Sequence, residues 1–222
     1  MKRITFIGLT LVAVIAVAVT AASAFASEPE FKNSSGNEAT GTSFKSLSGE
    51  GELKGTEKIT CKGGVTTGKI SGPSKVSEVL VDFTGCYKGT TSNQCKSTGQ
   101  SALSILTLHL QGTLGNVAKA EATSEVGELL SPENGGTEYT AVEKCTTVSP
   151  TKVKGSVIGE VVPVEAPASK TGYLLYAVSS PETLQAIMSF VGFPEDKLTA
   201  VGSAAIKVNN TVEFESPVYV VK

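Results

Sequence analysis

Apolar and polar residues alternate with a period of two along several short segments, which glycine, proline or asparagine separates. In residues 76–84, Val79 and Val81 share one face with further apolar residues, and most residues of the other face are polar. Residues 102–114 and 152–162 alternate in the same way. Because successive side chains of a strand point to opposite faces, each segment predicts a strand with one buried face. Such half-buried strands are typical of antiparallel sheets.

The C-terminal part of the chain predicts a hairpin. Residues 198–208 and 212–215 both alternate, and Asn209 and Asn210 lie between them. Asparagine tolerates a positive φ, so this pair favours a two-residue turn that joins two strands.

One segment, residues 181–191, has helical spacing instead. Pro181 suits the first position of a helix, and a serine before it supplies an N-cap. The apolar residues that follow recur at intervals of three or four up to Val191. We expect one short helix here, with a strand over residues 186–191 as the alternative.

Together these elements predict an all-β domain over residues 43–222. We expect an antiparallel β-sandwich with the short helix, and an open β-barrel is the alternative. Residues 27–42 are polar and rich in Gly, Ser and Asn, so we expect a flexible N-terminal segment there.

Residues 1–26 have the pattern of a secretory signal peptide. Lys2 and Arg3 precede a long apolar run, and small residues suited to cleavage follow it up to Ala26. We expect cleavage and a location outside the cell or in the cell envelope. The alternative is that the run is retained as a membrane anchor. After cleavage, no apolar run in the remaining sequence is long enough to span a bilayer.

The chain contains four cysteines, Cys61, Cys86, Cys95 and Cys145. An even number in an exported protein predicts two disulfides. Four cysteines allow three connectivities, which the sequence does not decide. We favour a short bridge from Cys86 to Cys95 and a long one from Cys61 to Cys145.

Composition restricts the chemistry. The sequence has one His, His109, and its one Arg, Arg3, lies in the signal peptide. The part after residue 26 has 17 Lys and 21 acidic residues, a formal charge of −4. A mildly acidic surface without Arg is a poor match to nucleic acid. The cysteine spacing and the single His do not form a metal site, so we expect neither metal nor cofactor.

Catalytic groups are sparse. His109 lies on the polar face of its predicted strand, and Glu213 and Glu215 share one strand face, as Glu50 and Glu52 do. Paired carboxylates can hydrolyse glycosides, and a histidine can act as a general base. Pairs of this kind arise readily in a Glu-rich chain, so we expect no catalytic residues. A small secreted hydrolase that uses a Glu pair or His109 is the alternative.

Tyr87 is the residue that we single out for binding. It lies in the short loop that a Cys86–Cys95 bridge would close, and an exposed tyrosine on a rigid loop can stack on a sugar or a protein surface. We expect a secreted or envelope-associated binding or structural module whose partner is a cell-wall polymer, a glycan or a surface protein. The sequence gives neither its ligand nor its oligomeric state.

Several phrases in residues 59–164 resemble a functionally uncharacterised family of secreted proteins from thermoleophilic soil actinobacteria. The resemblance implies export and a shared cysteine framework, and nothing about a substrate. The phrases that carry it are Ile59-Thr60-Cys61, Val81-Asp82-Phe83-Thr84-Gly85-Cys86, Cys95-Lys96-Ser97-Thr98-Gly99, Leu110-Gln111-Gly112-Thr113-Leu114-Gly115, Val126-Gly127-Glu128-Leu129 and Lys154-Gly155-Ser156-Val157-Ile158-Gly159.

Overall fold

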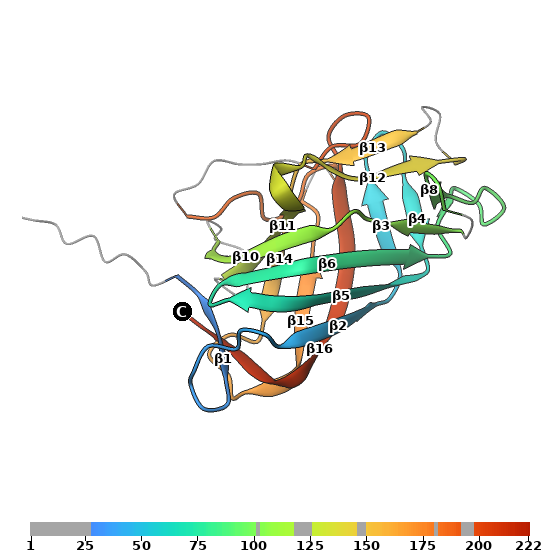
Figure 1. Cartoon of the computed structure of the whole chain (residues 1–222). Coiled ribbons are helices and arrows are strands. Elements are labelled where there is room, and N and C mark those ends of the chain that lie inside the picture. The colour runs from blue at the N-terminus through green and yellow to red at the C-terminus, as the bar shows by residue number, and fades with distance from the viewer. Residues whose placement is uncertain (1–27, 101–102, 118–125, 146–149, 180–181, 192–197) are drawn as a thin grey trace, which may run out of the picture.

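The computed structural model describes residues 28–100, 103–117, 126–145, 150–179, 182–191 and 198–222. Within these residues, eight antiparallel strands follow one another around a barrel, and the last strand pairs with the first (Figure 1). In chain order, which is also their order around the barrel, they are β2 (Ser43–Ser48), β5 (Gly63–Gly72), β6 (Lys75–Thr84), β10 (Leu110–Asn116), β11 (Val126–Pro132), β14 (Val157–Val162), β15 (Ser169–Tyr176) and β16 (Ala205–Val221).

Shorter elements extend both ends of the barrel (Figure 1). At one end β16 pairs with β3, which continues to β4 and β7, and a separate small sheet has the order β13-β12-β8. At the other end β1 pairs with the last residues of β16. Their bounds are β1 (Glu30–Asn33), β3 (Gly51–Lys54), β4 (Ile59–Cys61), β7 (Tyr87–Lys88), β8 (Lys96–Ser97), β9 (Ser104–Leu106), the 3-10 turn η1 (Glu133–Gly135), β12 (Glu138–Glu143) and β13 (Thr151–Lys154).

The all-β prediction is confirmed, but the preferred sandwich is not. The structure is a barrel, as in the alternative prediction, but the barrel is closed and not open. Closure depends on β16, which has 17 residues and pairs along its length with β15, β2, β3 and β1. Because β16 pairs with β15 on one side and with β2 on the other, the eight-stranded barrel has no unpaired edge strand.

The strand predicted over residues 76–84 is confirmed as β6. Val79 and Val81 point into the core, as the alternation requires. Glu78 has a positive φ of 54°, and its backbone N–H donates to the Glu133 carboxylate at 2.7 Å. This irregularity shifts the alternation by one residue, so Val76 is buried on the same side as Val79.

The other two predicted strands are each divided. Residues 102–114 separate into β9 and β10 at Thr107. Its N–H still donates to Val81 O at 2.9 Å, but its hydroxyl, in place of its carbonyl, accepts from Val81 N at 3.0 Å. Leu108 is therefore 57% exposed instead of buried. Residues 152–162 separate at Gly155, whose φ is 103°, into β13 and β14, which belong to different sheets.

The predicted hairpin at Asn209 and Asn210 is wrong, because both residues lie inside the continuous strand β16. They pair with Leu175 and Leu174 of β15, and Asn210 also pairs with Ser48. β15 holds both asparagines in an extended conformation, β2 also pairs with Asn210, and this pairing outweighs their preference for turns.

The predicted helix is also wrong over residues 182–191. These residues fold back on the end of β15, and Gln185 opposes Val178. Ile187 and Phe190 are buried against Val117, which replaces the helical packing that their spacing suggests. Ser180 and Pro181, the predicted start of the helix, lie outside the described residues.

The N-terminal segment also differs from its prediction. We expected residues 27–42 to be flexible, but from residue 28 onward they are placed against the barrel. β1 pairs with the end of β16, and Phe31 and Ala39 are only 4% and 2% exposed. The buried Phe31 explains why this polar segment packs. The predicted signal peptide, residues 1–26, lies outside the described residues.

Two disulfides are present, but they are not the pairs that we favoured. The structure joins Cys61 to Cys86 and Cys95 to Cys145, with Cα–Cα distances of 3.9 Å and 4.9 Å. Cys86 and Cys95 do oppose each other in a short hairpin, where Cys95 N donates to Cys86 O at 2.8 Å. Their side chains reach different partners, one in β4 and one after β12. The two bridges indicate an oxidising, extracellular environment.

Candidate functional site

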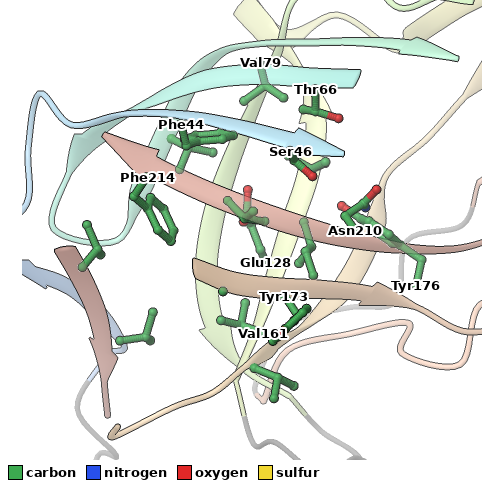
Figure 2. A pocket seen from close by; sticks show the side chains of 18 of the residues that line it. Phe44, Ser46, Thr66, Val79, Glu128, Val161, Tyr173, Tyr176, Asn210 and Phe214 are labelled. Carbon is green, nitrogen blue, oxygen red and sulfur yellow. The ribbon is translucent and has the colours of Figure 1, made fainter. Parts of the chain in front are cut away.

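A cavity of about 130 Å³ lies inside the barrel (Figure 2). Every barrel strand contributes to its lining, and most of the lining side chains are aliphatic or aromatic. Pro163 and Pro167, from the connection between β14 and β15, are exposed and also line the cavity. The cavity therefore approaches the surface at this end of the barrel.

Glycines on the inner wall help to make room for larger side chains. A Cβ atom at Gly68 would lie 2.5 Å from the Phe44 ring, and one at Gly112 would lie 2.6 Å from Glu128 Oε1. A Cβ atom at Gly159 would lie 2.9 Å from the Tyr176 ring. The side chains of Phe44, Glu128 and Tyr176 therefore occupy space that a side chain at the three glycine positions would fill.

Glu128 is the one charged side chain among the described residues that line the cavity. Its strand partner across the ladder is Gly159 of β14, and its carboxylate lies over Gly112 of β10. Glu128 is half-buried, and its side chain lines the cavity. Burial raises the pKa of the Glu128 carboxyl from 4.5 to about 7.

Tyr176 lies at the end of β15 on the same inner surface. Its side chain is buried, and its hydroxyl has no hydrogen-bond partner among the described residues. Burial, together with the charges of Glu128 and Tyr139, raises the pKa of the Tyr176 hydroxyl well above its usual value. A neutral hydroxyl can both donate and accept a hydrogen bond, and leaving it with no partner in an apolar surrounding costs free energy.

Further polar side chains contribute to the lining, among them Ser46 and Asn210. The buried Ser46 hydroxyl of β2 also has no partner among the described residues, and Asn210 of β16 is half-buried. In the view of Figure 2, Glu128 is in the middle, with the edge-to-face pair Phe44 and Phe214 on one side. Asn210 and Tyr176 are on the other side.

A second, smaller cavity of about 80 Å³ lies between the barrel and the small sheet. Its surface is almost entirely apolar. Five residues line both cavities: Phe83, Thr107, Tyr139, Val157 and Ile206. Tyr139 is already satisfied, since its hydroxyl donates to Leu130 O. Three buried side-chain oxygens of the described residues have no partner: those of Ser46 and Tyr176 line the larger cavity, and Asp82 Oδ1 lines neither cavity.

The residues that the sequence analysis singled out do not come together at the larger cavity. Tyr87 is half-buried in β7, where it pairs with Thr60, and it lines neither cavity. His109 is exposed between β9 and β10, and Glu213 and Glu215 are exposed on β16.

The remaining predicted carboxylate pair does not line the larger cavity, although Glu52 is among the residues that line the smaller one. Glu50 is exposed, and Glu52 forms ion pairs with Lys54 and Lys58. Among the described residues, no group of three or more His, Cys, Asp or Glu could hold a metal ion. Over the same residues, no helix has the length and apolar character needed to cross a membrane.

Sequence reasoning missed Glu128 and Tyr176, although a signal for Glu128 exists. Glu128 is in phase with Val126 and Leu130, which are 0% and 7% exposed, so the alternation of β11 directs its side chain inward. A single acid on the apolar face of a strand is the pattern that identifies it.

Comparison with protein-family models, curated proteins and solved structures finds no match for this chain.

Proposed function

We propose that this protein is an exported, non-enzymatic binding protein whose barrel encloses a small, mainly apolar molecule. One observation carries the proposal. The apolar cavity contains buried hydroxyl groups, on Tyr176 and Ser46, that have no partner among the described residues. Buried polar groups are nearly always hydrogen-bonded, so a partner from outside the chain accounts for them.

The size of the cavity limits the ligand. A cavity of about 150 Å³ holds benzene, and this one measures about 130 Å³. The ligand is therefore a small molecule with one ring or a short chain. This narrows the expectation from the sequence, because a cell-wall polymer or a folded protein does not fit such a space.

The export part of the proposal rests on other evidence. The basic and apolar N-terminal pattern is that of a signal peptide, and the two disulfides suit an oxidising compartment. An exported barrel with a small apolar cavity fits a role in sequestering or carrying a molecule outside the cytoplasm.

Xenon and benzene test the cavity itself. We expect both to bind the oxidised chain from residue 27 at one saturable site, measured by ¹²⁹Xe NMR and by the rise in the melting temperature. Val161→Phe fills the cavity and should abolish binding, whereas Val191→Phe, at a position that is 61% exposed, should not. Circular dichroism establishes that both variants are folded. The absence of binding, or equal binding by Val161→Phe, would refute the proposal.

A further inference from the structure

The lining of the larger cavity contains one charged group and no opposite charge. Its titratable side chains are Glu128 and four tyrosines, and no Lys, Arg or His is among the described residues that line it. Burial alone raises the pKa of Glu128, and no cationic side chain of the described residues lines the cavity to offset this cost.

We infer that the ligand of the barrel is a small amine whose ammonium group pairs with Glu128 inside the cavity. This inference rests on the proposed function and specifies the chemical class of the ligand. A buried carboxylate without a counter-ion is costly, and a cation that enters the cavity supplies the missing charge. An anionic ligand meets the opposite situation, since its charge would repel Glu128 and would find no basic partner.

The other polar groups of the lining suit the same head group. An ammonium has three N–H donors, and the lining offers oxygen acceptors on Glu128, Ser46 and Asn210. The unpartnered Tyr176 hydroxyl is also available to it as an acceptor. Hydrogen bonds between charged groups are stronger than those between neutral groups.

The rest of the cavity suits an apolar body. Phe44 and Phe214 contact each other edge to face, with ring centroids 6.3 Å apart, and valines from β6, β14 and β16 surround them. A phenyl ring or a short alkyl chain fills a volume of this size. Benzylamine combines both features and is therefore a suitable probe.

Three probes of nearly equal size separate the possible head groups: benzylamine is cationic, benzyl alcohol is neutral and benzoate is anionic. We expect calorimetry at pH 8 to show benzylamine binding about tenfold or more tighter than benzyl alcohol, the gain typical of a charge-assisted contact. Benzoate should bind weakest. Benzylamine affinity should also fall between pH 8 and pH 6 as Glu128 becomes protonated.

Glu128→Gln tests the residue, and Glu213→Gln is the matched control. Both remove one negative charge, but Glu213 is exposed on β16 and lines neither cavity. We expect Glu128→Gln to weaken benzylamine about tenfold or more and to leave benzyl alcohol within about threefold. Glu213→Gln should leave the affinity for both probes unchanged.

The outcomes separate the two proposals. If benzyl alcohol or benzoate binds as tightly as benzylamine, or if Glu128→Gln binds benzylamine like the wild type, the amine inference is wrong but the binding function stands. If none of the three probes binds, and xenon and benzene do not bind either, the binding function itself is wrong.

Discussion

The carboxyl group of Glu128 makes the stability of this protein depend on pH. Its pKa is raised to about 7 in the folded chain, whereas the ordinary value is 4.5. The fold therefore favours the protonated form. Its contribution to stability is complete below pH 4.5 and is lost as the pH rises through about 7.

Glu128→Gln should remove this dependence. Glutamine has the shape of a protonated Glu and does not ionise, so the variant should match the wild type at pH 4. At pH 8 it should be more stable by about 3 kcal/mol, the free-energy equivalent of the pKa shift. Urea unfolding at several pH values measures the difference. A constant difference between pH 4 and pH 8 would show that Glu128 does not titrate in this range.

Gly112 tests how closely the cavity wall is packed. A Cβ atom there would lie 2.5 Å from Val76 Cγ2 and 2.6 Å from Glu128 Oε1. Gly112→Ala should therefore lower the free energy of unfolding by about 1–3 kcal/mol, the usual cost of overpacking, and should displace the carboxylate. Gly49→Ala is the control, since nothing lies within 4 Å of a Cβ atom there. Equal stability of both variants would contradict the close packing.

At the scale of residues, the sequence predicts which side chains point inward better than it predicts what those side chains do chemically. The alternation in β6 correctly directs Val79 and Val81 inward. It also directs Glu128 inward, but a lone Glu among nineteen is normally taken as a surface residue. The absence of a nearby cation is a property of the folded barrel, and local spacing does not reveal it.

At the scale of elements, prediction fails where tertiary pairing outweighs local preference. Asn209 and Asn210 favour a turn, yet pairing of both with β15, and of Asn210 also with β2, holds them in β16. The 102–114 strand breaks at Thr107, because its hydroxyl replaces its backbone carbonyl as the acceptor for Val81 N of β6. The prediction of β6 is correct because the strands that pair with it, β5, β9 and β10, are compatible with its alternation of buried and exposed residues.

The position of residues 182–191 depends on one buried side chain, Gln185. Gln185 is 6% exposed, its amide donates to Ala177 O at 2.8 Å and Ile206 O at 3.0 Å, and its carbonyl accepts from Ile206 N at 3.0 Å. The Gln185 side chain thus makes the two hydrogen bonds to the Ile206 backbone that a neighbouring strand would otherwise make. It anchors the segment in place of helical hydrogen bonds.

Gln185→Leu should be strongly destabilising, because the backbone N–H and C=O of Ile206 would then be buried without these partners. We expect a loss of about 2–4 kcal/mol in the free energy of unfolding. Gln111→Leu, at an exposed position of β10, makes the same chemical change and should cost less than about 0.5 kcal/mol. Urea denaturation compares them, and equal losses would show that the Gln185 bonds contribute little.

At the scale of the whole molecule, the two disulfides are concentrated at one end. Cys61 ends β4, Cys86 follows β6, and Cys95 and Cys145 flank β8 and β12 of the small sheet. The backbone bond between Cys95 and Cys86 joins the two bridges. Together they tie the small sheet and the β3-β4-β7 extension to the barrel (Figure 1). The end with β1 relies on strand pairing and on the buried Phe31.

Reduction should therefore loosen the end of the molecule that contains the two disulfides before it loosens the barrel. The bridges close sequence separations of 25 and 50 residues. The chain-entropy model assigns them about 3.5 and about 4 kcal/mol. With dithiothreitol under native conditions, we expect hydrogen exchange to accelerate in residues 86–100 and 138–145, while the pairing of β15 with β16 stays protected. The double variant Cys95→Ser/Cys145→Ser should reproduce the effect in the small sheet. Uniform loss of protection in β15 and β16 would show instead that the bridges hold the whole barrel closed.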